Sequence, residues 1–274
     1  MMKIHNITLD KNSPLTFILG PCVIESETLV MQTAERLKRD CPYPFIFKSS
    51  FDKENRSSIH SFRGPGLEEG LRILQKVKEN FEIPVTTDIH APAQAAAVAQ
   101  VVDLIQIPAF LCRQTDLLMA AAKTGKPLHV KKGQFVAPHD MRHVCEKIRE
   151  AGGKDIILTE RGTTFGYNNL VSDMRSIPIM KSMGVLVCYD ATHSVQLPGG
   201  AAMQSGGERR FIPYLSKAAV AAGADLVYME THPDPKNAKS DAATQMPLDE
   251  LFDLLDHLHR LHNLNAEFDY VAPR

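Results

Sequence analysis

The feature that most constrains the fold is a repeat of short apolar runs, each followed by a segment with helical periodicity. The runs are rich in β-branched residues, end at polar or glycine-containing clusters and occur eight times along the chain. They cover residues 16–19, 44–47, 84–87, 104–107, 128–130, 156–159, 185–189 and 226–229. The predicted helices cover residues 26–40, 66–80, 92–101, 115–124, 140–151, 172–183, 208–222 and 247–263. Continuously apolar strands indicate a parallel sheet that is buried on both faces.

Eight strand–helix units in 274 residues predict an α/β protein with a closed (β/α)8 TIM barrel. The first dozen residues precede the first strand and are predicted to form a short N-terminal cap, and no linker divides residues 1–274 into further domains. A doubly wound sheet is the competing topology. Its one glycine-rich candidate, the segment 64–70 (GPGLEEG), places its third glycine one residue too late for the dinucleotide motif G-x-G-x-x-G. The barrel is therefore the predicted fold.

The charge balance excludes several classes of partner. Lys and Arg (31 residues) nearly cancel Asp and Glu (32 residues), so no overall field attracts nucleic acid or an anionic membrane. The N-terminal residues lack the apolar core of a signal peptide, and no stretch reaches the ~20 apolar residues of a membrane span. Five scattered cysteines without a C-x-x-C pair argue against a disulfide framework. Together these features predict a cytoplasmic protein of enzyme size, in which any anion binding is local.

Polar side chains follow most of the predicted strands, at the end of the barrel where such proteins carry their active sites. Four of them, Lys48, Lys53, Lys131 and Arg161, are cations from three strand ends in a chain of net charge −1. Their convergence predicts a site for a small polyanion such as a phosphorylated carboxylate, although any one of them could be a solvated loop charge. The polar residues predicted to face this mouth are Cys22, Lys48, Lys53, Asn55, Arg56, Asp88, Gln106, Lys131, Lys132, Glu160, Arg161, Asp190, His193, Glu230 and His232.

A second group combines a thiol, an imidazole and two carboxylates, namely Cys22, His193, Glu230 and Asp241. Such a set of N, S and O donors could hold a borderline divalent ion with one coordination position open. A buried cysteine and a hydrogen-bonded loop histidine explain the same residues without a metal. From composition and spacing alone, this explanation without a metal is favoured.

Several long motifs occur in order along the chain. They are GPCVIES (20–26), FKSSFDKENRSS (47–58), SFRGPG (61–66), TTDIH (86–90), QIPAFLCRQTDLL (106–118), KKGQF (131–135), TERGTTFGYNNLV (159–171), DATHSVQLPGG (190–200), METHPDP (229–235) and TQMPL (244–248). Through these motifs the sequence closely resembles the 3-deoxy-D-manno-octulosonate 8-phosphate synthase family over almost its whole length. The resemblance implies a (β/α)8 barrel, usually a homotetramer, that condenses phosphoenolpyruvate with D-arabinose 5-phosphate for lipopolysaccharide synthesis in Gram-negative bacteria.

The resemblance also implies roles for individual residues. The residues implied to surround phosphoenolpyruvate are Lys48, Lys53, Gln106, Ala109, Lys131 and Arg161. Those implied to hold arabinose 5-phosphate are Asn55, Arg56 and Ser57, with Asp88 at the sugar hydroxyls and Arg113 of a neighbouring subunit at the phosphate. The residues expected to take part in catalysis are Lys48, Lys53, Asp88, Lys131, Arg161 and His193.

Members of this family divide into a branch that uses a divalent metal and a branch that does not. The metal users carry Cys where this chain has Cys22, and the other branch carries Asn there. The segments 240–242 (SDA) and 244–245 (TQ) also resemble the metal-using form. The resemblance therefore implies a divalent cation such as Zn, Fe or Mn, with Cys22, His193, Glu230 and Asp241 as its ligands.

Two other functions are kept as alternatives. A related synthase condenses phosphoenolpyruvate with erythrose 4-phosphate, but it has a Lys-Pro-Arg-Thr type motif where this chain reads KENRSS (53–58). A non-catalytic phosphosugar-binding barrel would bind both substrates without releasing phosphate.

Overall fold

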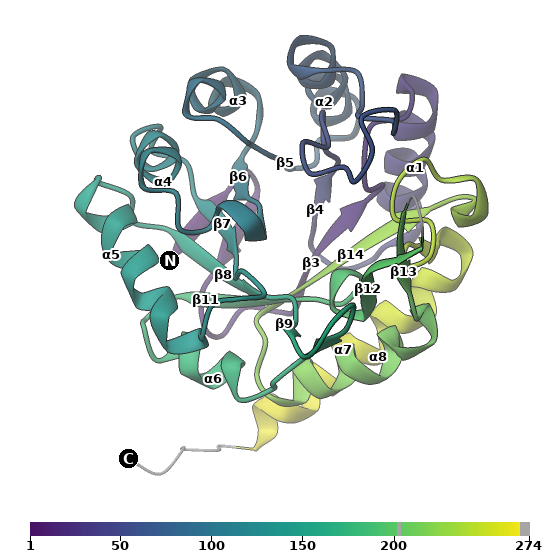
Figure 1. Ribbon diagram of the computed structural model, residues 1–274. Coiled ribbons are helices and arrows are strands. Elements are labelled where there is room, and N and C mark those ends of the chain that lie inside the picture. Colours follow the sequence, from purple (N-terminus) through teal and green to yellow (C-terminus); the bar gives the residue numbers. More distant parts are fainter. Residues whose placement is uncertain (202–203, 269–274) are drawn as a thin grey trace.

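The computed structural model describes residues 1–201 and 204–268, and these contain a closed barrel of parallel strands (Figure 1). In order around the ring the strands are β3 (Thr16–Gly20), β4 (Phe45–Lys48), β5 (Val85–Asp88), β6 (Leu104–Ile107), β7 (Leu128–Lys131), β8 (Ile156–Glu160), β11 (Leu186–Asp190) and β14 (Leu226–His232). The ring closes because β14 pairs in parallel with both β11 and β3. The predicted (β/α)8 TIM barrel is confirmed. Residues 202–203 and 269–274 of the predicted domain lie outside the described part of the chain.

Helices surround the barrel; α1 to α7 connect its strands, and α8 follows the last one (Figure 1). They are α1 (Glu27–Asp40), α2 (Leu67–Phe81), α3 (Ala95–Val101), α4 (Thr115–Ala122), α5 (Met141–Glu150), α6 (Ser176–Lys181), α7 (Ile212–Ala221) and α8 (Leu248–Glu267). Within residues 1–201 and 204–268, no helix is long and apolar enough to cross a membrane.

The predicted helix over 172–183 is shorter at its N-terminal end than the pattern indicates, because α6 begins only at Ser176. The Asp173 carboxylate accepts a hydrogen bond from the backbone N–H of Arg175, and the Asp173 carbonyl accepts one from the N–H of Ser176. These bonds close a turn in place of a first helical turn, which is the usual competition of a short polar side chain with a helix. The helix predicted over 92–101 also starts later than expected, because this segment begins as the 3₁₀ turn Pro92–Gln94 and α3 follows only from Ala95.

Among the described residues, two separate hydrophobic cores hold the barrel together. The larger core lies between the strands and the surrounding helices, and a smaller one fills the bottom of the barrel. In the smaller core, the hairpin of β1 (Met2–Ile4) and β2 (Ile7–Leu9) packs against Ile18, Leu104 and Leu226. Because Leu104 and Leu226 begin their strands, this hairpin closes the N-terminal end of the barrel. The predicted N-terminal cap is thus observed, and a functional site inside the barrel can lie only at the carboxyl end of its strands.

Short strands that the apolar pattern does not predict lie in the loops after the barrel strands. The antiparallel pair β9 (Thr163–Thr164) and β10 (Leu170–Val171) follows β8, and the pair β12 (Gln196–Ala201) and β13 (Gln204–Gly207) follows β11. Strand β15 (Met246–Pro247) pairs with the end of β14. These elements shape the carboxyl end of the barrel.

Candidate active site

Strand alternation decides which polar residues enter the barrel. On β7, His129 and Lys131 lie on the inner side, whereas Leu128 and Val130 pack in the outer core. The next residue, Lys132, is therefore directed outward, and its ammonium lies 3.5 Å from Glu160 Oε2 and 3.1 Å from Thr163 Oγ1. The expectation that Lys132 and Glu160 face the mouth is wrong, because adjacent residues of a strand point to opposite faces.

The predicted cations converge on the inside of the barrel. Lys48, Lys131 and Arg161 are each at most 5% exposed, and Lys53 is partly buried in the loop that follows β4. The Lys48 ammonium donates to the Cys22 carbonyl at 2.9 Å and lies 3.1 Å from Glu230 Oε1. The Arg161 guanidinium donates to the carbonyl of His193 at 3.0 Å. Four cations in so small and buried a space favour an anionic ligand.

The acidic neighbours of these cations control their protonation. Burial lowers the pKa of Lys131, and Asp190, whose Oδ2 lies 2.6 Å from the Lys131 ammonium, opposes that shift. Burial likewise lowers the pKa of Arg161. For Lys53 burial acts in the same direction, but the surrounding acidic groups, led by Cys22 and Glu230, outweigh it and raise the pKa. The site therefore combines positive groups for an anion with negative groups that keep them charged.

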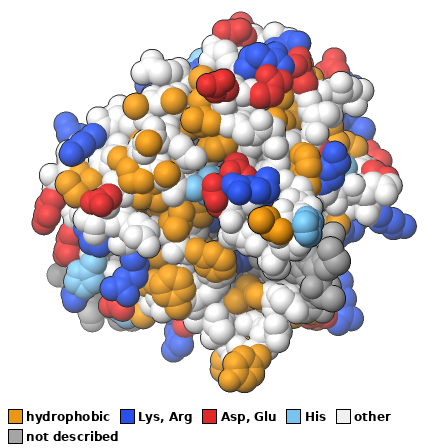
Figure 2. Space-filling model, turned by 45° about the horizontal axis from the view of Figure 1, so that its top comes forward, with side chains coloured by type: hydrophobic (Ala, Val, Ile, Leu, Met, Phe, Trp, Pro, Cys, Tyr) orange, Lys and Arg blue, Asp and Glu red, His pale blue; other side chains and the backbone are white. Residues whose placement is uncertain are grey.

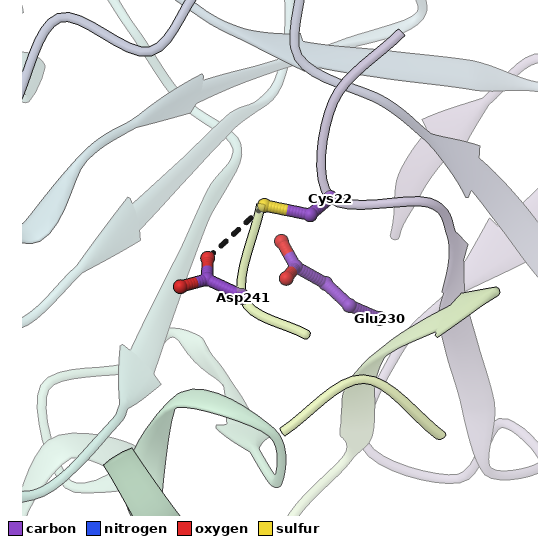
Figure 3. A group of neighbouring side chains, drawn as sticks. All are labelled: Cys22, Glu230 and Asp241. Carbon is purple, nitrogen blue, oxygen red and sulfur yellow. Dashed lines mark hydrogen bonds between the residues drawn. The ribbon is translucent and has the colours of Figure 1, made fainter. Parts of the chain in front are cut away.

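Next to the cations lies a compact group of possible metal ligands. Ligand atoms of Cys22, Glu230 and Asp241 all lie within 4.8 Å of one another, and Cys22 Sγ is 3.0 Å from Asp241 Oδ2 (Figure 3). His193 lies beside them, with Nε2 at 3.6 Å from Glu230 Oε1 and 3.7 Å from Asp241 Oδ2. The structure thus brings together the four residues that the sequence suggested as metal ligands.

The local backbone explains how these ligands meet. Gly20 precedes the Cys22 loop with φ of +147°, and a Cβ atom there would lie 2.1 Å from the carbonyl oxygen of Lys48, so only glycine allows β3 and β4 to approach this closely. Asp241 has φ of 48°, a left-handed conformation that is uncommon outside glycine and is often found at functional sites. The Gln245 side chain joins the two loops, because it accepts from the Cys22 N–H and donates to the Ser240 carbonyl.

The donor set fits a divalent cation. A thiol, an imidazole and two carboxylates are the ligand types of borderline divalent metals. Glu230 Oε2 is buried and has no hydrogen-bond partner among the described residues. A buried carboxylate oxygen without a partner is energetically unfavourable, and a bound cation would provide that partner. Burial and the carboxylates of Asp241 and Glu230 raise the pKa of the Cys22 thiol well above its usual range, so a cation is needed to favour the thiolate.

Asp88 forms a separate polar group on the opposite side of Lys48. Its carboxylate accepts a hydrogen bond from Ser50 Oγ and lies 3.0 Å from His90 Nε2. Although burial favours the neutral acid, His90 and Lys48 lower the pKa of Asp88 well below its usual range. Asp88 is therefore an ionised acceptor inside the barrel, suited to hydroxyl groups.

The remaining predicted residues occupy different depths. Gln106 and Ala109 are buried, and Gln106 Oε1 has no hydrogen-bond partner among the described residues. Arg56 is half-buried and donates to the carbonyls of Phe62 and Lys239, whereas Asn55 and Ser57 are exposed on the same loop. Gln106 thus lies on β6 inside the barrel, Ala109 follows that strand, and Asn55, Arg56 and Ser57 lie on the loop after β4.

Arg113 does not join the cations either. It is exposed and lines a groove of about 560 Å³ together with Phe135, His143 and Lys147. Within a single chain the Arg113 side chain is thus directed to the outer rim.

Two residues of the site receive no role from the sequence. Asp190 stands in the list of polar strand ends, but nothing in its spacing marks it as the partner of both Lys131 and His193. Tyr228 is fully buried on β14, and in the sequence it reads as an ordinary residue of an apolar strand. The only available signal is its alternation with Glu230, which places both side chains on the inner face.

The fold and the site define a barrel protein whose mouth combines a cationic anion pocket with a thiol–imidazole–carboxylate group. The chain belongs to the DAHP synthetase I family, whose model matches residues 1–265.

Relatives are similar over nearly their full lengths. The chain is 57% identical over 263 residues to a 2-dehydro-3-deoxyphosphooctonate aldolase of Trichlorobacter lovleyi, covering 95% of this chain and 97% of that protein. It is 54% identical over 264 residues to the protein of the same name from Protochlamydia amoebophila, covering 95% and 96%. A third protein of that name, from Francisella tularensis, is 53% identical over 266 residues, covering 96% and 97%.

Proposed function

We propose that this chain is a carbon–carbon bond-forming enzyme that condenses phosphoenolpyruvate, D-arabinose 5-phosphate and water to 3-deoxy-D-manno-octulosonate 8-phosphate and inorganic phosphate. The observation that carries the proposal is the position of Lys48, Lys131 and Arg161 directly beside the Cys22–Glu230–Asp241 group inside a barrel mouth. The relatives named 2-dehydro-3-deoxyphosphooctonate aldolase, similar over whole chains, support the same reaction. Its product would serve lipopolysaccharide synthesis.

Phosphoenolpyruvate is assigned to the cationic half of the site. Its phosphate and carboxylate would be neutralised by the residues that the resemblance indicates, Lys48, Lys53, Gln106, Ala109, Lys131 and Arg161. The unpaired oxygen of Gln106 supports this assignment, because a ligand would complete a group that is costly to leave unpaired. The buried positive charges of Lys131 and Arg161 also favour an anionic ligand.

Arabinose 5-phosphate is assigned to the loop after β4. Asn55, Arg56 and Ser57 would bind it from this loop, and Asp88 would accept its hydroxyl groups. Arg113 would reach the sugar phosphate of a neighbouring subunit, which agrees with its outward position.

The proposal includes a homotetramer in the cytoplasm. Exposed aromatic residues, of which Phe135 shares the groove of Arg113, support an assembly, because large apolar side chains rarely gather on the surface of a monomer. They are Phe110, Phe135, Phe165 and Tyr167. In Figure 2, hydrophobic side chains surround a small group of acidic and basic side chains near the middle of the face shown.

A divalent cation is part of the proposal, with Cys22, His193, Glu230 and Asp241 as the residues that would hold it. When bound, it would supply Lewis acidity and an orienting contact for the substrates. The protein's own groups prepare the ligands: Asp190 Oδ2 lies 2.8 Å from His193 Nδ1, so Nε2 is left to face the ligand group.

The reaction forms a bond between C3 of phosphoenolpyruvate and the aldehyde carbon of the sugar. The aldehyde C=O π bond opens, and its oxygen takes a proton to become a hydroxyl. Water adds at C2 and gives up its protons as C2 becomes the keto carbon, the bond between C2 and the phosphate oxygen breaks, and inorganic phosphate leaves with the electron pair of that bond. Lys131 and Arg161 would stabilise the leaving phosphate, and Glu230 and Asp241 would stabilise positive charge that develops at C2. Holding both substrates at attack distance is needed because the enol carbon is a weak nucleophile.

The decisive experiment is a measurement of phosphate release from phosphoenolpyruvate and arabinose 5-phosphate by chelator-stripped protein, with and without added divalent metal. Erythrose 4-phosphate is the control sugar. We expect activity that metal restores and that is confined to the five-carbon sugar. Activity with erythrose 4-phosphate alone would assign the related synthase reaction, and binding of both substrates without phosphate release would assign a binding protein.

A further inference from the structure

Tyr228 lies between the two halves of the candidate site. It is 1% exposed and stands two residues before Glu230 on β14, so both side chains point into the barrel. Its hydroxyl donates to Glu230 Oε1 at 2.9 Å, and Lys48 lies 3.1 Å from the same oxygen. This carboxylate oxygen is thereby fully occupied, and Oε2 is the one left without a partner.

The ring of Tyr228 lies under the cations. The Lys131 ammonium is 3.5 Å from the ring centroid, and the Lys48 ammonium is 5.7 Å from it. A cation over an aromatic face is attracted by the negative face of the ring, and the attraction is strongest where water is excluded. Because Lys131 is 5% exposed, the ring and Asp190 replace much of the hydration that its ammonium loses on burial.

We propose that Tyr228 is a positioning residue for both ligands of the enzyme, its hydroxyl fixing Glu230 for the divalent cation and its ring fixing Lys131 for the substrate phosphate. This inference rests on the proposed function. It explains why a hydroxylated aromatic residue occupies a place that phenylalanine or leucine could fill in an apolar core. The two parts of the side chain act on different ligands, so they can be separated by substitution.

The substitution Tyr228→Phe tests the hydroxyl. It removes the hydrogen bond to Glu230 and keeps the ring below Lys131. We expect Co²⁺, titrated into chelator-stripped protein and followed by its thiolate charge-transfer absorption, to bind about 10-fold more weakly, the usual effect of losing a group that orients a metal ligand. The KM for phosphoenolpyruvate should stay within about twofold of the wild-type value, because the cation–ring contact remains.

The substitution Tyr228→Leu tests the ring. It should weaken Co²⁺ binding as Tyr228→Phe does and should also raise the KM for phosphoenolpyruvate by roughly 5- to 30-fold, the range given by the strength of a desolvated cation–ring contact. If the leucine variant does not fold, replacement of Tyr228 by pentafluorophenylalanine keeps a ring of similar shape and removes its negative face. The same rise in KM relative to Tyr228→Phe is then expected.

Tyr43→Phe is the matched control. Tyr43 also donates its hydroxyl to a carboxylate, that of Asp256 at 2.7 Å, but this pair lies outside the barrel. The Tyr43→Phe substitution should leave Co²⁺ binding and the KM for phosphoenolpyruvate unchanged. Unaltered Co²⁺ affinity in Tyr228→Phe, or equal KM values in the variants with and without the aromatic face, would overturn the inference. A wild-type protein that releases no phosphate would instead refute the proposed function, and the Co²⁺ titration would still test the contact to Glu230.

Discussion

The carboxylate of Asp190 lies 2.6 Å from the ammonium group of Lys131 at the end of β7. The same carboxylate lies 2.8 Å from Nδ1 of His193, and its side chain is fully buried. Although burial favours the neutral acid, His193 and Lys131 lower the pKa of Asp190 well below its usual range. One ionised group thus holds a proposed phosphate ligand and a proposed metal ligand together.

We therefore expect Asp190→Asn to impair both stability and turnover. Removing one partner of a buried ion pair destabilises a protein by ~3–5 kcal/mol, because the other charge is left uncompensated. The free energy of unfolding in urea should fall by about this amount, and kcat/KM should fall by at least about 100-fold.

Asp173→Asn is the control for Asp190→Asn. Asp173 pairs with Arg175 at 2.9 Å, but the Arg175 side chain is 85% exposed, and such a surface pair contributes ~0–1 kcal/mol. Equal losses in the two variants would show that the buried position of Asp190 has no special effect.

Arg161→Ala should reduce transition-state stabilisation by about 2–4 kcal/mol, because it removes a charged partner of the substrate phosphate. The measurement is kcat/KM for phosphoenolpyruvate in the phosphate-release assay. Arg175→Ala removes an exposed arginine and should leave this value unchanged. Kinetics of Arg161→Ala that match the wild type would show that the phosphate lies elsewhere.

Cys22→Asn should leave part of the activity in metal-free protein, because it reproduces the residue of the branch that needs no metal. This outcome is expected if a divalent cation mainly orients the substrates. The assay compares chelator-stripped and metal-supplemented variant, with Cys41→Asn at the C-terminal end of α1 as a cysteine control outside the barrel. Complete loss of turnover under both conditions would contradict an orienting role.

The fold could be predicted from the sequence because the barrel strands are covered on both faces, so most of them are short runs rich in apolar residues. The strand 104–107 is found with the predicted bounds, since both Leu104 and Ile105 are fully buried in different cores. The hairpins β9–β10 and β12–β13 could not be predicted. Their strands are held by cross-strand backbone pairing in loops of mixed polarity, which leaves no apolar run to detect.

The site could be predicted only in part, because strand ends indicate the mouth of a barrel but not the face on which each side chain lies. Lys131 and Lys132 are adjacent, yet one reaches Asp190 inside the barrel and the other reaches Glu160 outside it. Tyr228 could not be recognised, since its role depends on contacts with residues from other strands. Sequence patterns report local periodicity, and these contacts are set by closure of the barrel.

A buried histidine below the site predicts a pH dependence of stability. His129 is fully buried on β7, and its Nε2 forms a hydrogen bond with Thr159 Oγ1. Burial and, secondarily, the charge of Lys131 lower the pKa of His129 to about 3. In the unfolded chain a histidine has a pKa of about 6.5. Between these values the unfolded state binds the additional proton, so the contribution of neutral His129 to stability is complete above about pH 6.5 and declines as the pH falls toward 3.

Replacing this histidine should therefore flatten the acid side of the stability curve. We expect the free energy of unfolding of chelator-stripped wild type to fall by roughly 2–3 kcal/mol more than that of His129→Gln between pH 6.5 and pH 4.5. Glutamine keeps a polar group near Thr159 but does not titrate. Urea unfolding at several pH values measures both curves, and equal m-values ensure that the unfolded states are comparable. Parallel curves would mean that His129 takes up its proton in the folded barrel as readily as in the unfolded chain.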